Sequence, residues 1–146
     1  MYRNILVPVD GSEAVGRAVR EAIQLAHCLS SRIRLIHVVN GIPWLAQAGP
    51  ALVEELITEL RSAGESIILE AKTAVRSAGI EVDDRLIEAK SERPGEIIVT
   101  EANDWPAELI VCGTHGRRGL KCLLMGGDAE YIVRHSPVPV LLVHGS

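Results

Sequence analysis

The stretch ELIVCGTHGRRGLKCLLMGGD at residues 108–128 joins a short apolar run to a loop rich in glycine and basic residues. Residues 108–112 have the composition of a buried strand, and Arg117, Arg118 and Lys121 follow among five glycines. Glycine lets the backbone come close to a ligand, and successive N–H groups in such a loop form a concave anion site. The stretch therefore predicts a strand whose carboxyl end carries an anion-binding loop, as in open parallel sheets.

Apolar runs and helical periodicities alternate along the rest of the chain. Several strand candidates are continuously apolar, as expected where both faces of a sheet are covered. Residues 94–104 contain IIVT and are ambiguous, and we assign them to a helix because parallel strands need a crossover there. The order predicts an α/β fold, a doubly wound five-stranded parallel sheet with helices on both faces, in one domain over residues 1–146. The expected strands are 4–9, 32–39, 80–89, 107–113 and 138–145, and the expected helices are 12–31, 51–78, 94–104 and 128–136.

Local signals mark the ends of these elements. Ser12 is expected to cap the first helix, because a serine hydroxyl accepts a hydrogen bond from a first-turn N–H. Gly64 is an expected weak point inside the second long helix, and Gly79 suits the position just past its end. Residues 40–50, NGIPWLAQAGP, are expected to form a loop of unusual length and apolar content. That loop would cover the pocket or pack on a partner.

Composition excludes several classes of function. The net charge of −4 argues against general nucleic-acid binding, and the aromatic content of 3% argues against a surface for stacking bases. No apolar run reaches the roughly 18 residues of a membrane span, and the N-terminus does not resemble a signal peptide. Cys28, Cys112 and Cys122 are odd in number, which predicts reduced thiols in a cytoplasmic protein.

Metal and nucleophile signals are weak. His27, His37, His135 and His144 lack metal-ligand spacing and are expected to be structural. His115 has no serine or cysteine arrangement around it, so we expect a polar contact there rather than a catalytic role. The sequence therefore predicts no catalytic residues and no metal-binding side chains.

The glycines and the helix that follows them favour a phosphate group as the bound anion. Neither G-x-x-x-x-G-K-[ST] nor G-x-G-x-x-G occurs, which leaves Gly113, Gly116 and Gly126 separated by two and nine residues. Gly126 and Gly127 come just before a helix, whose N-terminus adds oriented N–H donors and the positive end of a dipole. This arrangement fits a polyphosphate that is held mainly by backbone groups.

At these residues the chain resembles the universal stress proteins. The likeness runs through ILVPVDGS (5–12), LIHVV (35–39), LIVCGTHGRRGL (109–120) and VRHSPVPVLLV (133–143), and the family's motif is G-x2-G-x9-G followed by Ser or Thr. The resemblance implies an adenine nucleotide alpha hydrolase-like fold with strand order 3-2-1-4-5. It also implies a stress-response sensor or regulator that binds ATP or another adenine nucleotide with Mg²⁺. A homodimer would form through the C-terminal strand, about 138–143, and a protein partner is unknown.

The resemblance also assigns roles to individual positions. The end of the first strand would contact adenosine, the second strand would meet adenine, and the glycine loop would surround the ribose and phosphates. Two simpler interpretations stay open, since Asp10 can cap the first helix and Arg117 with Arg118 can be a solvated pair. The expected binding residues are Pro8, Val9, Asp10, Val38, Cys112, Gly113, Thr114, His115, Gly116, Arg117, Arg118, Gly119, Gly126, Gly127 and Asp128.

The last turn departs from the family pattern. Where the family has Gly-Ser-Val, this chain has Gly126, Gly127 and Asp128, so one hydroxyl donor is missing and a carboxylate is added. Asp128 would fill the anion site and repel a γ-phosphate, or help to hold a Mg²⁺ ion on the phosphates. The hypothesis is that nucleotide binding is retained but weakened, or shifted toward AMP or ADP.

Two rival functions stay open at this stage. In a nucleotide-free dimeric interaction module, Asp128 would occupy the phosphate site, and the protein would act through its dimer and the 40–50 loop. An adenylyl-transfer enzyme would need a signature such as H-x-x-H after the first strand, which VDGSEA (9–14) lacks. We expect a binding protein rather than an enzyme, with slow ATP hydrolysis left open.

Overall fold

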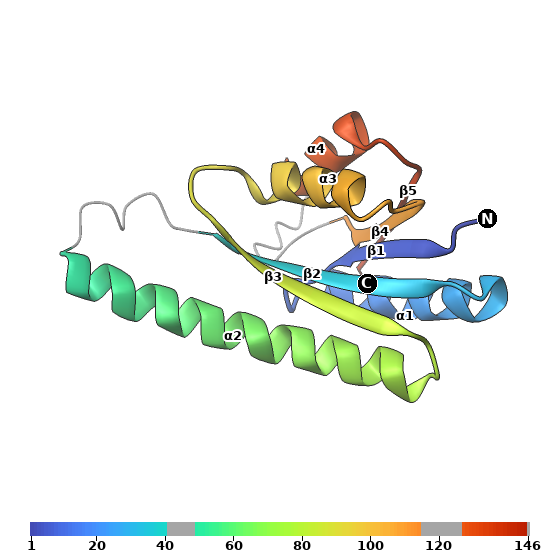
Figure 1. The fold of residues 1–146 in the computed structure, drawn as a ribbon, viewed down its shortest axis with the longest axis horizontal. Coiled ribbons are helices and arrows are strands. Elements are labelled where there is room, and N and C mark those ends of the chain that lie inside the picture. The colour runs from blue at the N-terminus through green and yellow to red at the C-terminus, as the bar shows by residue number, and fades with distance from the viewer. Residues whose placement is uncertain (41–48, 115–126, 146) are drawn as a thin grey trace.

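The computed structural model describes residues 1–40, 49–114 and 127–145. Within these ranges, five parallel strands form one sheet in the order β3-β2-β1-β4-β5, and four helices accompany it (Figure 1). The predicted fold class and strand order are confirmed. The elements are β1 (Asn4–Pro8), α1 (Glu13–Leu29), β2 (Arg32–Asn40), α2 (Pro50–Ser77), β3 (Val82–Ala89), α3 (Pro94–Asp104), β4 (Leu109–Gly113), α4 (Gly127–His135) and β5 (Val140–Val143).

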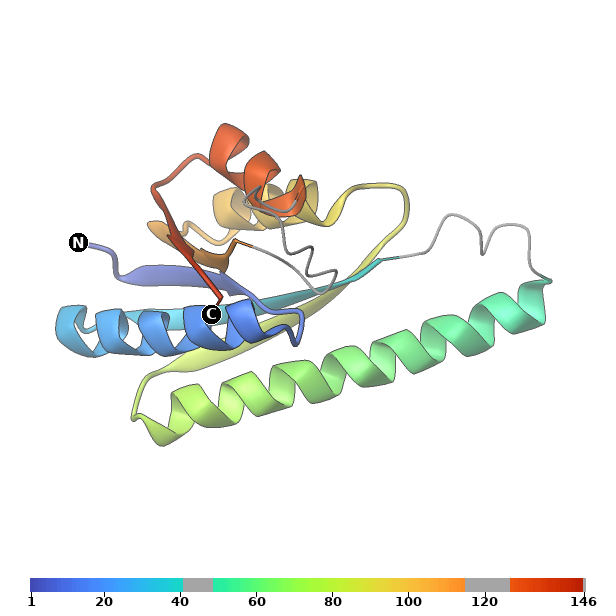
Figure 2. The ribbon, with the colours of Figure 1, turned by 180° about the vertical axis from the view of Figure 1, so that it is seen from behind.

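The helices cover the sheet in two pairs. Helices α1 and α2 lie on one face and α3 with α4 on the other, as both ribbon views show (Figures 1 and 2). Each face has its own core, because successive side chains of a strand point to opposite sides. In β1, Ile5 and Val7 belong to the core under α1 and α2, whereas Leu6 belongs to the core under α3 and α4. The continuous apolar run of β1 is thus explained by burial on both faces.

The predicted helix over 94–104 is confirmed as α3, so the crossover argument was correct. The predicted cap of α1 is also confirmed, because Ser12 Oγ accepts a hydrogen bond from the Val15 N–H at 3.3 Å. Three strands begin later than predicted, since β3, β4 and β5 start at 82, 109 and 140.

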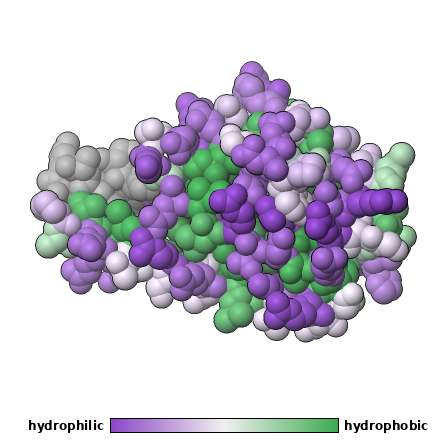
Figure 3. Space-filling view, viewed as in Figure 1, coloured by the Kyte–Doolittle hydropathy of each residue, from purple (hydrophilic) through white to green (hydrophobic). Residues whose placement is uncertain are grey.

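Helix α2 is the longest element and extends past the end of the sheet (Figures 1 and 2). Hydrophilic side chains cover much of the face in Figure 3, with hydrophobic ones visible between them. Leu52 and Leu69 of α2 are among the exposed large hydrophobic residues. Within the described ranges, no helix has the length and apolar character needed to cross a membrane.

Glycines in and after α2 have separate roles. The expected weakness at Gly64 does not interrupt the helix, and Gly64 is buried where α2 approaches β2. Gly79 has a φ of 78° and its N–H bonds to the Arg76 carbonyl, while the Ile80 N–H reaches Val75 at 3.4 Å. These bonds form the Schellman ending that was predicted from Gly79.

Candidate functional site

The candidate site lies where the order of the strands reverses. Strand β1 pairs with β2 on one side and β4 on the other, so its carboxyl end is a topological switch point. The pairs Pro8↔Ile36 and Leu6↔Ile110 set the register. Continuing this register brings the ends of β1, β2 and β4 to the same edge of the sheet. The turn after β1 and the end of β4, at Gly113 and Thr114, therefore lie at the same edge.

The turn after β1 is fixed by backbone and side-chain hydrogen bonds. The Val9 N–H donates to the Ile36 carbonyl at 2.8 Å, and Asp10 Oδ1 accepts from the Ser12 N–H at 2.9 Å. Gly11 has a φ of 81°, a conformation that favours glycine. Asp10 thus bonds to the cap residue Ser12 and is not itself the N-cap of α1, while its contact with a ligand stays a prediction.

The end of β4 offers its backbone rather than its side chains. The Cys112 side chain lies in the core under α3 and α4, and burial raises the pKa of its thiol to about 11. Thr114 is 2% exposed, and its N–H donates to the Val143 carbonyl at 3.1 Å. Gly113 between them is half-buried. A ligand at this strand end would therefore meet main-chain groups.

The start of α4 carries the last of the expected binding residues, Gly127 and Asp128. Among the described residues, a Cβ added to Gly127 would meet no heavy atom within 4 Å, so these residues leave the helix start sterically open. Asp128 Oδ1 accepts a hydrogen bond from the Gly95 N–H at 3.2 Å, in the first turn of α3.

Val38, the expected adenine contact, is half-buried against the core under α3 and α4. Other expected binding residues cannot be placed. Residues 115–119 and Gly126 lie outside the described residues, as does most of the 40–50 loop. In the described part of the chain, no group of three or more His, Cys, Asp or Glu side chains is arranged to hold a metal ion.

Sequence reasoning missed a role for His37. Its Nδ1 lies 2.8 Å from the Val9 carbonyl oxygen, at the turn that follows β1. The sequence gives no sign of this contact, because the partner is a backbone atom 28 positions away. Only the parallel register of β1 and β2 brings the two together.

Sequence reasoning also missed a partly buried ion network between the sheet and α3. Glu101 is 3% exposed and accepts hydrogen bonds from Arg34 and Arg85, each at 2.9 Å. Arg34 also makes a two-pronged contact with Asp83 at 2.7 and 2.9 Å, which raises the pKa of Arg34, and Glu101 adds to this rise. The Arg34 guanidinium lies 4.7 Å from the centre of the Trp105 ring.

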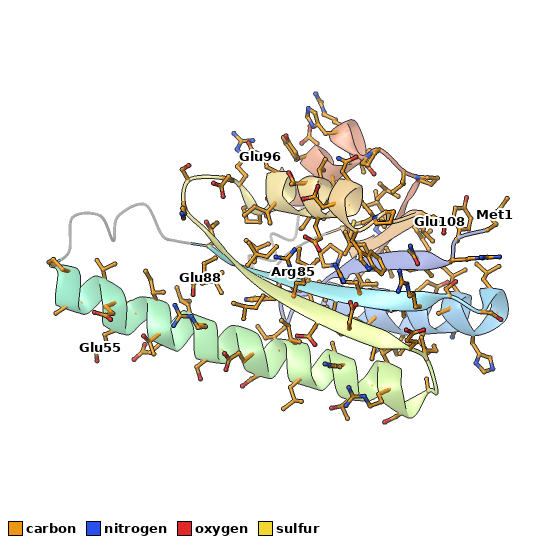
Figure 4. All side chains as sticks on the ribbon, in the orientation of Figure 1. Met1, Glu55, Arg85, Glu88, Glu96 and Glu108 are labelled. Atoms are coloured by element: carbon orange, nitrogen blue, oxygen red, sulfur yellow. The ribbon has the colours of Figure 1, made fainter. Side chains whose placement is uncertain are left out.

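This network belongs to one face of the sheet and not to the strand ends. Arg85 and Glu88 both lie on β3, and their partners are on opposite faces (Figure 4). Arg85 bonds to Glu101 of α3, whereas Glu88 pairs with Arg61 of α2. All four charged groups of the network have partners, so we assign it to the stability of the α3 face.

Comparison with known proteins identifies the family. The model of the universal stress protein family matches residues 1–144. The chain belongs to this family. Universal stress protein MJ0531 of Methanocaldococcus jannaschii is 30% identical over 146 residues, which cover 98% of this chain and 82% of that protein. A universal stress protein of Thermus aquaticus is 30% identical over 144 residues, with coverage of 98% and 99%.

Solved structures of universal stress proteins share the fold. The structure of MJ0577 is 27% identical, covers 100% of this chain and 98% of its own, and superposes with a TM-score of 0.87. Three more distant structures are complexes with adenine nucleotides, and at their identities the likeness concerns the fold. They contain cAMP (23% identity, coverage 99% and 98%, TM-score 0.71), AMP in a protein of Arabidopsis thaliana (17%, 98% and 92%, 0.72) and dAMP in a protein of Archaeoglobus fulgidus (22%, 97% and 98%, 0.68).

Proposed function

We propose that this universal stress protein binds an adenine nucleotide at the carboxyl ends of β1 and β4 and acts as a sensor or regulator in a stress response. The observation that carries the proposal is the meeting of the β1 turn and the end of β4 at one switch point of the sheet. The complexes of distant relatives with AMP, dAMP and cAMP support an adenosine monophosphate unit as the common ligand.

The phosphate part of the site favours fewer phosphates. Gly127 stands where the family pattern has a hydroxyl, and a single lost hydrogen bond is worth about 0.5–1.5 kcal/mol. Asp128 adds a negative charge at the same helix start, and its repulsion grows with the charge of the ligand. The backbone N–H groups of the α4 start are unaffected by either residue. We therefore propose AMP or ADP as the better ligand, with ATP bound more weakly and helped by Mg²⁺.

The site is proposed to bind and not to catalyse. Its described part offers backbone groups, the Asp10 carboxylate, which accepts a hydrogen bond from the Ser12 N–H, and the buried Cys112 thiol. The raised pKa of this thiol keeps it protonated at neutral pH. A hydrolase would need a base beside an attacking water. We propose that the cellular signal is occupancy of the nucleotide site, and that the protein works in the cytoplasm with a protein partner.

The C-terminal strand is proposed to join two copies of the chain. In the described part of the chain, β5 pairs with β4 and lies at the edge of the sheet. All four of its side chains are half-buried. An apolar edge strand is a template for pairing, and a two-fold axis through it gives a closed homodimer.

The proposed ligand can be tested on protein purified without added nucleotide. The protein is denatured, and the released small molecules are analysed by mass spectrometry and absorbance at 260 nm. Titration calorimetry of emptied protein with AMP, ADP and ATP, with and without Mg²⁺, then ranks the ligands. We expect binding near one nucleotide per chain, with AMP or ADP tighter than metal-free ATP. No binding of any adenine nucleotide would instead favour a nucleotide-free interaction module.

A further inference from the structure

A histidine of β2 holds the turn that follows β1. Nδ1 of His37 lies 2.8 Å from the Val9 carbonyl oxygen. Since a carbonyl oxygen only accepts, the bond requires a proton on Nδ1. His37 is 8% exposed and Val9 is 4% exposed, so little water competes for either group. The ring is thus a side-chain donor to this carbonyl in a buried position.

The bond sets the direction of the next peptide unit. The Val9 N–H is already held by the Ile36 carbonyl at 2.8 Å, one residue past the end of β1. Because a trans peptide is planar, a Val9 carbonyl that points to the ring turns the Asp10 N–H the opposite way. The ring thus sets where the backbone of the turn presents its groups.

Helix α2 packs against the His37 ring at Gly64, where the helix has no side chain. A Cβ on Gly64 would lie 2.5 Å from His37 Cδ2 and 2.9 Å from its Nε2, closer than real carbon atoms approach. A second contact joins the same helix to the turn, since a Cβ on Gly11 would lie 3.2 Å from Ile67 Cγ1. The backbone of α2 therefore closes over the ring, and only glycine leaves the room for it.

We propose that His37 is a positioning residue of the nucleotide site, which fixes the Val9–Asp10 turn through the Val9 carbonyl, and that Gly64 sets the place of its ring. The inference rests on the proposed function, because the turn is where adenosine is expected to bind. His37 acts from behind the turn and does not itself contact the nucleotide.

Two substitutions at His37 separate the hydrogen bond from packing. His37→Leu removes the donor and keeps an apolar group of similar reach, whereas His37→Asn keeps an N–H donor near the position of Nδ1. AMP binding is measured by calorimetry at a temperature where circular dichroism shows every variant folded. We expect AMP to bind about tenfold more weakly to His37→Leu, and within about threefold of wild type to His37→Asn.

Gly64→Ala tests the seat of the ring from the α2 side. Its methyl group should displace His37 and weaken AMP binding in the wild-type background. The shorter side chain of His37→Asn should tolerate it, so the double variant binds as His37→Asn alone does. Gly16→Ala is the matched control, because the nearest described atom to a Cβ there is Arg20 Nη1, at 3.9 Å. The control should bind AMP as the wild type does.

The outcomes distinguish the inference from the proposed function. Wild-type protein that binds no adenine nucleotide would defeat the proposed function and the inference with it. Wild-type binding with unchanged affinity in His37→Leu, or equal losses in the Leu and Asn variants, would defeat the inference alone. If His37→Leu fails to fold, the Gly64→Ala comparison and ¹⁵N NMR of the ring decide. The spectrum should show a proton on Nδ1, and a neutral ring protonated only on Nε2 would overturn the proposal.

Discussion

The Asp128 carboxylate bonds to the Gly95 N–H at 3.2 Å and so joins the first turn of α4 to the first turn of α3. The two helices pack closely at this point, because a Cβ on Gly95 would lie 3.1 Å from Tyr131 Cβ. A carboxylate at a helix N-terminus is stabilised by the unpaired N–H groups and the helix dipole. Asp128 therefore has a structural partner as well as a place beside the proposed phosphate site.

Removing only the charge of Asp128 should separate these two roles. Asp128→Asn keeps an oxygen that can accept from Gly95, and we expect ATP to bind about two- to fivefold more tightly, with AMP changed less. The free energy of unfolding should fall by about 0.5–1 kcal/mol, because the charge no longer faces the helix dipole. Calorimetry and urea denaturation measure the two effects.

Glu130→Gln is the matched control for this charge change. Glu130 lies on the same helix, but it is half-exposed and pairs with Arg134 at 3.0 Å. Its loss should leave both nucleotide affinities unchanged. Equal effects of the two variants on ATP would mean that only the net charge of the protein matters, and that Asp128 has no local role.

Gly127→Ser should restore the hydroxyl donor of the family pattern. The described part of the chain leaves room at this position, since a Cβ there meets none of its atoms within 4 Å. A new hydrogen bond to phosphate should tighten ATP and AMP binding by about three- to tenfold. Gly127→Ala adds the same Cβ without the hydroxyl and should bind as the wild type does. Equal gains in Ala and Ser would assign the effect to the helix and not to a phosphate contact.

Glu101→Gln should be strongly destabilising. The 3% exposed carboxylate balances Arg34 and Arg85, and its neutralisation leaves two guanidinium groups short of one charge. We expect the free energy of unfolding in urea to fall by about 2–4 kcal/mol. Glu88→Gln, in the exposed pair with Arg61, should lower the free energy of unfolding far less, because solvent screens this pair. Similar losses in both variants would contradict the assignment of Glu101 to the core of this network.

Sequence reasoning predicted the elements well where a topological rule added to local patterns. Residues 94–104 are ambiguous by composition because IIVT could be a strand, yet the parallel sheet requires α3 there, and the bounds agree. The starts of β3 and β5 were predicted too early, because the residues just before them make local hydrogen bonds outside the sheet. Ile80 belongs to the end of α2 through its bond to Val75, and the Val138 N–H bonds to Ser136 Oγ at 3.1 Å before β5 begins.

The candidate site was predicted in part, for a related reason. Residues at the ends of β1 and β4 were found because their motifs are local in the sequence. The contacts of His37 with Val9 and of Asp128 with Gly95 depend on strand register and helix packing. Local patterns in a single sequence do not predict these contacts, because the partners of His37 and Asp128 are backbone groups of Val9 and Gly95.

The buried thiol of Cys112 should make stability depend on alkaline pH. Burial raises its pKa from 9.0 to about 11, so the unfolded chain loses this proton at lower pH than the folded protein. The protonated thiol contributes at most about 2–3 kcal/mol to the free energy of unfolding. This contribution is fully present below pH 9 and is lost as the pH rises toward 11. Urea denaturation should show a shallower decline over this range for Cys112→Ala. Parallel curves for the two proteins would contradict the raised pKa.

Leu142→Pro should separate the proposed homodimer into single chains. The Ile110 and Thr114 N–H groups bond to the carbonyls of Pro139 and Val143, so the backbone groups of alternate residues in β5 point to β4. The backbone N–H of Leu142 therefore points to the free edge. Proline at 142 removes an N–H from that edge while the bonds to β4 stay possible. Light scattering after gel filtration should give a dimer for the wild type and a monomer for the variant. Leu69→Ala, on the exposed surface of α2, should stay a dimer, and a monomeric wild type would refute pairing through β5.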